Sequence, residues 1–389
     1  MKPTPLLFLS DSPHLATGLS RITRDLATHV CSLPQFRVGT MGLGGNGSSK
    51  LPWAQYCFDE THQWGEEHIE ENWDDFAGSE RGIIMTIWDL SRLDWFARPK
   101  MGGRLQKFLE SKKFLKWAYV PVDHYGIDGK VTSLAADTLL GFDRVLAYTL
   151  FGKKVLEDTL GREVDWIPHG FRGDVFMPRD KAPGRAMLGV KPDEELIGCV
   201  MTNQARKDWG VCISTWQRLR RPGRRFWAHV DTPTRYWNLY ALLADFEFAE
   251  DDVIMTFNGM FDNETLSYLY SACDVTMLPS LGEGFGYPIV ESLACGVPVV
   301  HTNYGGGAEL IPEKEWLVDK VGERLDTLWN CVRPVLSPIN WAEKVEWAVT
   351  QHADGTYKDV CVRSVEHLEW QKLWPSCWQK WFLEGVRSE

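Results

Sequence analysis

The chain has 389 residues, which is enough for two domains if a domain has roughly 150 residues. Its composition, 44% apolar and 24% charged, is that of a globular protein, and a formal net charge of −11 argues mildly against a protein held on nucleic acid by a basic surface. The nine cysteines form no CxxC pair, and no apolar run is long enough for a signal peptide or a membrane span. We therefore expect a reduced, cytoplasmic protein without a disulfide framework, a zinc site or a transmembrane segment.

The first half of the chain alternates between short apolar runs and amphipathic stretches. Thr4–Leu9 has the composition of a buried parallel strand, and apolar residues recur at helical spacing directly after it, at Leu19, Ile22, Leu26 and Val30. Further strands are predicted at Phe36–Met41, Gly82–Trp88, Lys116–Pro121, Arg144–Tyr148 and Val164–Ile167, with a helix over Phe151–Leu160 that ends at Gly161. This alternation predicts a parallel sheet covered by helices over residues 1–175.

A second series of the same kind follows over residues 176–363. Strands are predicted at Leu196–Met201, Arg225–Val230, Val253–Phe257, Val275–Leu278 and Val297–His301. Helices are predicted between them at Trp209–Arg220, Arg235–Phe246, Glu264–Ala272 and Pro288–Ala294. The stretch Phe176–Asp193, rich in Pro, Gly and charge, is interpreted as a linker. The Trp-rich tail at residues 364–389 is predicted to be helical and to pack across the domains.

The predicted fold is therefore α/β, with two doubly wound sheets that face each other across a cleft. In such sheets ligands bind beyond the carboxyl ends of the strands, so the loops that follow the strands are the candidate functional segments. These loops are Ser10–Gly18, Asp123–Lys130, Thr202–Asp208, Asn258–Asp262 and Ser280–Gly286.

The segment Ser280–Glu291, with sequence SLGEGFGYPIVE, is the strongest functional signal in the chain. Three glycines precede Pro288, and proline is favoured at the first position of a helix, so a glycine-rich loop feeds a helix N-terminus. Such a terminus offers backbone N–H groups and a positive dipole end, which suit a diphosphate. Glu283 and Glu291, with seven residues between them, could accept hydrogen bonds from sugar or ribose hydroxyls. The alternative is a purely structural role, in which the same residues form a glycine-rich turn and a glutamate that caps the helix.

This segment resembles the E-x7-E motif of the GT-B glycosyltransferases, in particular the retaining enzymes of family 4. The resemblance extends over about forty contiguous residues, through DVTMLPS at 274–280, ACGVPVVH at 294–301 and GGGAELI at 305–311. Weaker similarity covers YVPVDH at 119–124, FDRVLAYT at 142–149 and IPHG at 167–170. The segments that resemble the family therefore extend over most of the chain and occur in the order expected for the family.

The resemblance implies a GT-B fold in which the second domain binds a nucleoside-diphosphate sugar and the first binds mainly the acceptor. Glu291 would hold the ribose hydroxyls and Glu283 would lie by the donor sugar. The rest of the loop would face the sugar and phosphates through Gly284, Phe285, Gly286 and Tyr287. The resemblance also implies a retaining reaction without a bound metal or other cofactor.

Other candidate residues follow predicted strands. Arg206 and Lys207 could neutralise a diphosphate, although the family usually has an arginine where this chain has Thr202. Gly18 resembles the family's glycine loop after the first strand and is a candidate donor contact, or simply part of a tight turn. His124 would reach the donor sugar, and the adjacent Asp123 is a candidate acceptor contact; a structural role for this histidine remains an alternative.

Two further motifs are interpreted without catalytic roles. Gly42–Gly47 matches G-x-G-x-x-G formally, but Pro52 disfavours the helix that a dinucleotide site needs directly behind it, so we interpret it as a loop. The basic run Arg218–Arg225 ends a predicted helix and is interpreted as a solvated turn. Its alternative is a contact with a polyanionic acceptor or a peripheral contact with a membrane surface.

The predicted function is transfer of a sugar from a nucleoside-diphosphate sugar to a hydroxyl acceptor of unknown identity: a glycan, a lipid, a small molecule or a modified DNA base. A glycosyltransferase of hydroxymethylated DNA bases is one alternative, which would need a basic, aromatic-lined first domain. A sugar-nucleotide epimerase would need an acid/base pair and no acceptor groove. A third alternative is a non-enzymatic nucleotide-sugar sensor. The intact Glu283, Lys207 and Glu291 argue against it, while Thr202 in place of the usual arginine keeps it open.

Overall fold

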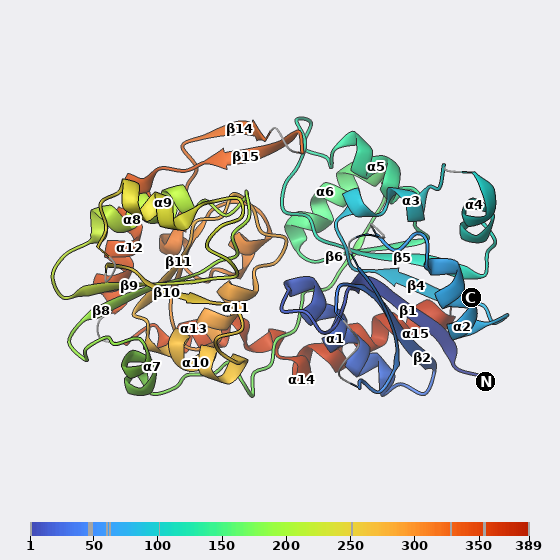
Figure 1. The fold of residues 1–389 in the computed structure, drawn as a ribbon, viewed down its shortest axis with the longest axis horizontal. Helices are drawn as coiled ribbons and strands as arrows, with labels where there is room; N and C mark the ends of the chain where they lie inside the picture. Colours follow the sequence, from blue (N-terminus) through green and yellow to red (C-terminus); the bar gives the residue numbers. More distant parts are fainter. Residues whose placement is uncertain are drawn as a thin grey trace. The chain divides into compact units, whose positions relative to one another are not determined.

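The computed structural model describes residues 2–45, 50–59, 61, 64–100, 102–249, 252–326, 329–352 and 355–387. The chain forms two compact units (Figure 1), one made of Met1–His169 with Leu373–Glu389 and the other of Gly170–Lys372. The second unit thus begins after His169 and ends at Lys372. The domain boundaries predicted from the sequence lie between residues 175 and 176 and between residues 363 and 364. Part of Gly42–Gly47 lies outside the described residues.

The first unit contains a seven-stranded parallel sheet in the order β3-β2-β1-β4-β5-β6-β7. The strands are β1 (Thr4–Asp11), β2 (Phe36–Leu43), β3 (Ala54–Phe58), β4 (Gly82–Thr86), β5 (Phe114–Val120), β6 (Arg144–Ala147) and β7 (Asp165–Trp166). The strand order reverses between β1 and β4, which is the topological switch point of a doubly wound sheet. The predicted strands are present, and β3 is an edge strand that the sequence analysis missed.

Helices connect these strands as the amphipathic stretches predicted. They are α1 (Gly18–Cys31), α2 (Ile69–Ala77), α3 (Asp94–Ala97), α4 (Gly103–Leu109), α5 (Ser133–Leu139) and α6 (Leu150–Leu160). Thr149 caps α6 by accepting a hydrogen bond from the backbone N–H of Gly152, and Gly161 ends it with a φ of 65°. This left-handed conformation is the one that favours glycine after a helix.

The C-terminal tail completes the core of the first unit. It runs through α14 (Trp370–Leu373), a π-helical turn (Trp374–Trp378) and α15 (Gln379–Arg387). Phe382 packs edge-on against Phe8 of β1, with ring centroids 6.5 Å apart, and Trp381 packs on Trp117 of β5 at 5.0 Å. The tail therefore supplies apolar cover for the sheet that the preceding helices leave open, and its tryptophans are core residues.

The second unit contains a six-stranded parallel sheet in the order β10-β9-β8-β11-β12-β13. Its strands are β8 (Glu195–Val200), β9 (Arg224–Val230), β10 (Ile254–Phe257), β11 (Val275–Leu278), β12 (Val299–Thr302) and β13 (Leu317–Val318). Its helices are α7 (Lys181–Met187), α8 (Trp209–Leu219), α9 (Leu239–Asp245), α10 (Asn263–Ala272), α11 (Tyr287–Ala294), α12 (Pro338–His352) and α13 (Lys358–Val365).

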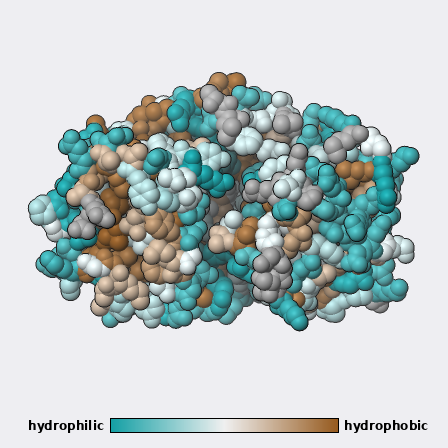
Figure 2. Space-filling model, in the orientation of Figure 1, coloured by the Kyte–Doolittle hydropathy of each residue, from teal (hydrophilic) through white to brown (hydrophobic). Residues whose placement is uncertain are grey.

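An antiparallel hairpin of β14 (Gly322–Asp326) and β15 (Cys331–Val335) lies between the last strand of this sheet and α12. Several apolar side chains around it are exposed, and brown surface lies over this part of the second unit in Figure 2; the exposed residues are Val321, Leu325, Trp329 and Val335. Among the described residues of both units, no helix is both long and apolar enough to cross a membrane.

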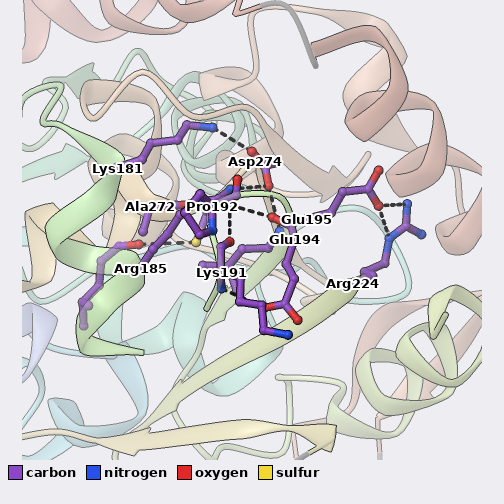
Figure 3. A network of polar contacts seen from close by, with 12 residues as sticks. Lys181, Arg185, Lys191, Pro192, Glu194, Glu195, Arg224, Ala272 and Asp274 are labelled. Atoms are coloured by element: carbon purple, nitrogen blue, oxygen red, sulfur yellow. Dashed lines mark hydrogen bonds and ion pairs between the residues drawn. The ribbon is translucent and has the colours of Figure 1, made fainter. Parts of the chain in front are cut away.

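The stretch interpreted as a linker is instead an ordered part of the second unit. It contains α7, and Arg185 on that helix is buried and donates to the carbonyl of Glu194 at 2.6 Å. The Asp274 carboxylate accepts from Arg185 at 2.9 Å and from Lys181 at 2.7 Å, as Figure 3 shows. The Pro- and Gly-rich composition misled the prediction because the contacts with Asp274 join residues about ninety positions apart.

The basic run at 218–225 is largely neutralised within the second unit. Arg224 has a fully buried side chain and pairs with Glu195 and Glu346, each at 2.6 Å. Arg221 also contacts Glu346, at 3.0 Å, and Arg220 contacts Asp252 at 2.9 Å. These contacts give Arg224 a structural role at the start of β9 and pair Arg220 and Arg221 with carboxylates of the second unit.

Candidate functional site

The Glu-containing loop lies at the carboxyl end of β11 and leads into α11. Gly286 is the N-cap of α11 with a φ of 107°, a conformation that L side chains rarely adopt. Pro288 lies in the first turn, as the sequence predicted. Glu291 is on the same helix, so the two glutamates of the motif occupy the loop and the helix that follows it. Phe285 is buried and Tyr287 half-buried, and their rings pack edge-on at 5.6 Å.

The loop after β8 is joined to this loop by backbone hydrogen bonds. The N–H of Leu281 donates to the carbonyl of Arg206 at 2.8 Å, and the N–H of Asp208 donates to the carbonyl of Pro279 at 3.0 Å. Lys207 also forms an isolated bridge with Ser280. These contacts hold the two loops in register, because both leave neighbouring strands, β8 and β11, at the same edge of the sheet.

As a result, three predicted site residues form one cluster. The Lys207 ammonium donates to Oε1 of Glu283, and Nη1 of Arg206 lies 3.3 Å from Oε2 of the same carboxylate. The side chains of Glu283 and Lys207 are 5% and 6% exposed, while Arg206 is 27% exposed. Thr202 is half-buried in the same loop and carries no charge.

Burial by itself would raise the pKa of Glu283, because it disfavours the charged carboxylate. The Lys207 ammonium and the Arg206 guanidinium outweigh burial and lower this pKa to about 2. Glu283 is therefore an anion at any physiological pH. It serves as an acceptor of hydrogen bonds and has no proton to give.

His301, at the end of β12, is a buried member of this region that the sequence analysis did not select. Its Nδ1 lies 2.9 Å from the carbonyl oxygen of Leu278, so Nδ1 carries the proton, and Nε2 makes no hydrogen bond to the described residues. Burial lowers the pKa of His301 to about 4, which keeps the ring neutral. A Cβ on Gly307 would lie 2.6 Å from this Nε2 and 3.0 Å from Cβ of Glu283, so a larger residue would not fit.

The second glutamate has its own set of partners. Glu291 is 5% exposed, and the Tyr270 hydroxyl from α10 donates to its Oε2 at 2.9 Å. His229, at the end of β9, is close enough to be influenced by this carboxylate, and its Nδ1 lies 2.8 Å from Oγ1 of Thr256. Burial lowers the pKa of His229, and Asn258 and Glu291 oppose that shift only in part. Tyr270 and His229 were missed, although His229 ends a predicted strand.

The remaining predicted residues belong to the first unit. Gly18 is exposed and is the first residue of α1, which Thr17 caps, so its backbone is helical. His124 and Asp123 follow β5 and hydrogen bond to each other through Nδ1 and Oδ1. Another polar group here was not predicted: Asp11 accepts from the indole N–H of Trp88 at 2.9 Å and from the Thr17 hydroxyl at 2.7 Å.

A cavity of about 620 Å³ in the first unit contains none of the predicted residues. It lies at the amino ends of β4, β5 and β6, among residues such as Arg81, Lys116 and Asp143. Because ligands of doubly wound sheets bind at the opposite, carboxyl ends, we do not place the reaction there. No group of three or more His, Cys, Asp or Glu side chains in the described part of the chain is arranged to hold a metal ion.

Comparison with known proteins agrees with this geometry. Residues 238–325 match the family described as "Glycosyl transferases group 1". D-inositol 3-phosphate glycosyltransferase of Mycobacteroides abscessus is 33% identical over 150 residues, which are 37% of this chain and 32% of that protein. The protein of the same name from Acidothermus cellulolyticus is 31% identical over 248 residues, covering 58% and 53% of the two chains. The chain thus spans between about a third and a half of the length of these relatives.

Solved structures match over nearly the whole chain. Sucrose-phosphate synthase from Thermosynechococcus elongatus has a TM-score of 0.74 at 17% identity, covering 99% of this chain and 100% of its own. Anabaena HepE, solved with UDP and glucose, has a TM-score of 0.73 at 14% identity, with the same coverage. At these identities the likeness establishes the fold, which confirms the predicted GT-B architecture. The chain therefore has two parallel-sheet units of GT-B architecture, and its segment 238–325 is similar to the glycosyl transferases of group 1.

Proposed function

We propose that this protein transfers a sugar from a nucleoside-diphosphate sugar to an acceptor hydroxyl, with retention of anomeric configuration and without a bound metal. The observation that carries the proposal is the cluster of Glu283 with Lys207 and Arg206, in which Glu283 lies on the same loop–helix segment as Glu291 and the two cations lie on the loop after β8. It combines two cations and two carboxylates at the carboxyl edge of a parallel sheet, next to the first turn of a helix. This sequence of charges matches a ligand that consists of sugar, diphosphate and ribose in a row.

Each group has a distinct role in the proposal. Glu291, held by Tyr270, accepts hydrogen bonds from the ribose hydroxyls. Lys207 and Arg206, with the start of α11, neutralise the diphosphate. Glu283, which stays ionised, accepts from hydroxyls of the donor sugar. HepE was solved with UDP-glucose, which supports a nucleotide-sugar donor for this fold.

In the reaction, the bond between the anomeric carbon and the diphosphate oxygen breaks, and its electron pair leaves with the diphosphate. The acceptor oxygen bonds to the same carbon and passes its proton to the leaving diphosphate. Negative charge on the leaving group is largest in the transition state, so fixed positive groups accelerate the step more than they tighten ground-state binding. Gly18, His124 and Asp123 of the first unit are the proposed groups near the donor sugar and the acceptor.

We further propose that the protein works in the cytoplasm. Nine cysteines are free, and a reducing compartment would keep them so. The acceptor is identified here only by its reacting hydroxyl group.

A thermal-shift screen with UDP-, GDP- and ADP-glucose tests the proposal. At one hundred times its dissociation constant, a donor stabilises the protein by about 2.7 kcal/mol, which corresponds to roughly 5–10 °C for a unit of this size. The Glu291→Ala variant should bind the corresponding nucleoside diphosphate about ten- to hundredfold more weakly in calorimetry, since charge-assisted ribose hydrogen bonds are lost. Glu343→Ala, at an exposed position on α12, is the matched control and should bind normally. An unchanged dissociation constant in a folded Glu291→Ala variant would remove Glu291 from the site.

A further inference from the structure

Both cations that we assign to the diphosphate are already engaged by a carboxylate in the ligand-free chain. Glu283 contacts Lys207 through one oxygen and Arg206 through the other, the latter at 3.3 Å. The two buried partners, Glu283 and Lys207, therefore neutralise each other, and the trio has a net charge of only +1. A diphosphate must draw on the same N–H donors, so it competes with Glu283 for them.

We infer that Glu283 is a specificity-determining residue that makes the site favour a nucleoside-diphosphate sugar over the bare nucleoside diphosphate. The inference rests on the proposed function. When phosphates take the N–H donors of Lys207, the Glu283 carboxylate loses its strongest partner, and a buried carboxylate without donors is unfavourable. The hydroxyls of a bound sugar replace the lost donors, whereas a nucleoside diphosphate brings none to this position.

Among the described residues, the hydrogen bonds found for the Glu283 carboxylate come from Lys207 and Arg206. Its backbone is fixed, because the N–H of Gly306 donates to its carbonyl at 2.9 Å. A Cβ on Gly305 would lie 3.2 Å from that same carbonyl oxygen, so this side is closely packed as well. His301 cannot donate through Nε2, since its single proton is on Nδ1, where Leu278 accepts it. The displaced carboxylate therefore stays in the site and selects for a ligand that carries hydroxyl donors.

The experiment compares Glu283→Gln with the wild type by calorimetry, using the pairs UDP and UDP-glucose, GDP and GDP-mannose, and ADP and ADP-glucose. This substitution keeps the shape of the side chain and an acceptor oxygen for Lys207 but removes the competing charge. The variant should bind the nucleoside diphosphate about ten- to hundredfold more tightly, the scale of one charge-assisted interaction. It should bind the nucleotide sugar no more tightly than the wild type does, so the preference for the sugar falls by at least about tenfold.

Glu283→Asp serves as the second variant because it retains the negative charge on a shorter side chain. It should keep the weak binding of the nucleoside diphosphate; a tightening as large as that of Glu283→Gln would show that charge is not the cause. Suppose that a nucleoside diphosphate and its nucleotide sugar both bind to the wild type and to Glu283→Gln. If the preference for the nucleotide sugar is then the same in the two proteins, the inference is wrong while the proposed function stands. If no pair binds the wild type, the proposed function fails and the inference fails with it.

Discussion

Lys207→Met separates the structural role of the Lys207–Glu283 pair from its role in catalysis. In the wild type, the side chains of Glu283 and Lys207 are 5% and 6% exposed, and each is the other's closest partner of opposite charge. Removing the ammonium leaves Glu283 buried beside the partly exposed Arg206. Breaking a buried pair in this way typically costs about 3–5 kcal/mol. The pKa gives a similar figure: a shift from 4.5 to about 2 corresponds to roughly 3 kcal/mol of stability at neutral pH.

The expected loss is therefore about 3 kcal/mol, or roughly 6–12 °C in the melting temperature of the second unit. Its pH dependence has a definite sign. In the wild type the pKa of Glu283 is lowered by folding, so its stabilising contribution is present above about pH 4.5 and is lost as the pH falls toward 2. In Lys207→Met, we expect burial to outweigh the remaining Arg206 and to raise the pKa of Glu283. Lowering the pH from 7 to 5 should therefore stabilise the variant relative to the wild type.

The double variant Lys207→Met, Glu283→Gln is the decisive control. Removing the stranded carboxylate should recover most of the lost stability, while turnover should remain at least about two orders of magnitude below the wild type, the scale of one lost charge stabiliser. Melting curves from pH 5 to 8 and donor turnover under the same conditions measure both quantities. Recovery of turnover together with stability would refute the reasoning, because Lys207 would then act only through the fold.

Three further predictions concern Tyr270, Arg206 and the absence of a metal requirement. Tyr270→Phe removes the hydroxyl that holds Glu291 and should weaken nucleoside-diphosphate binding by up to about tenfold in calorimetry, less than Glu291→Ala does; an equal or larger loss would mean that Tyr270 itself contacts the ligand. Arg206→Ala should lower kcat by about a hundredfold, more than it raises the donor KM, while Thr202→Arg should be neutral or mildly favourable; a near-normal kcat for Arg206→Ala would make it a solvated residue at the helix start. Excess EDTA should leave transfer rates largely unchanged, and activity that is lost with chelator and restored by magnesium or manganese would contradict the metal-independent proposal.

Local patterns were sufficient to predict most of the fold. The strands with continuous apolar runs, such as Thr4–Leu9 and Val275–Leu278, appear as β1 and β11 with shifts of a residue or two at most. The edge strand β3 was missed because Ala54–Phe58 lies half-exposed and has no such run. Helix α9 begins at Leu239, later than predicted, since Asn238 caps it and Asn203 holds the backbone of Trp237 at 2.8 Å.

The candidate site was predicted residue by residue but not as an arrangement. The glycine loop and its helix start follow from local sequence, because Gly286 and Pro288 fix the backbone there. The pairing of Lys207 with Glu283 joins residues 76 positions apart. The hydrogen bond from Tyr270 to Glu291 and the electrostatic influence of Glu291 on His229 likewise depend on the tertiary fold of the second unit. No local pattern determines such contacts, so these residues became visible only in the folded unit.

The most direct test of the central claim is hydrolysis of UDP-, GDP- or ADP-glucose with water as the acceptor. The release of nucleoside diphosphate and of glucose is monitored by NMR. The proposal predicts that the wild type releases the nucleoside diphosphate from at least one donor, with the freed glucose first appearing as the α anomer, as retention requires. Lys207→Met, Glu283→Gln should release it at least about a hundredfold more slowly although it is folded. Absence of release from every donor, or equal release by the wild type and this variant, would contradict the account.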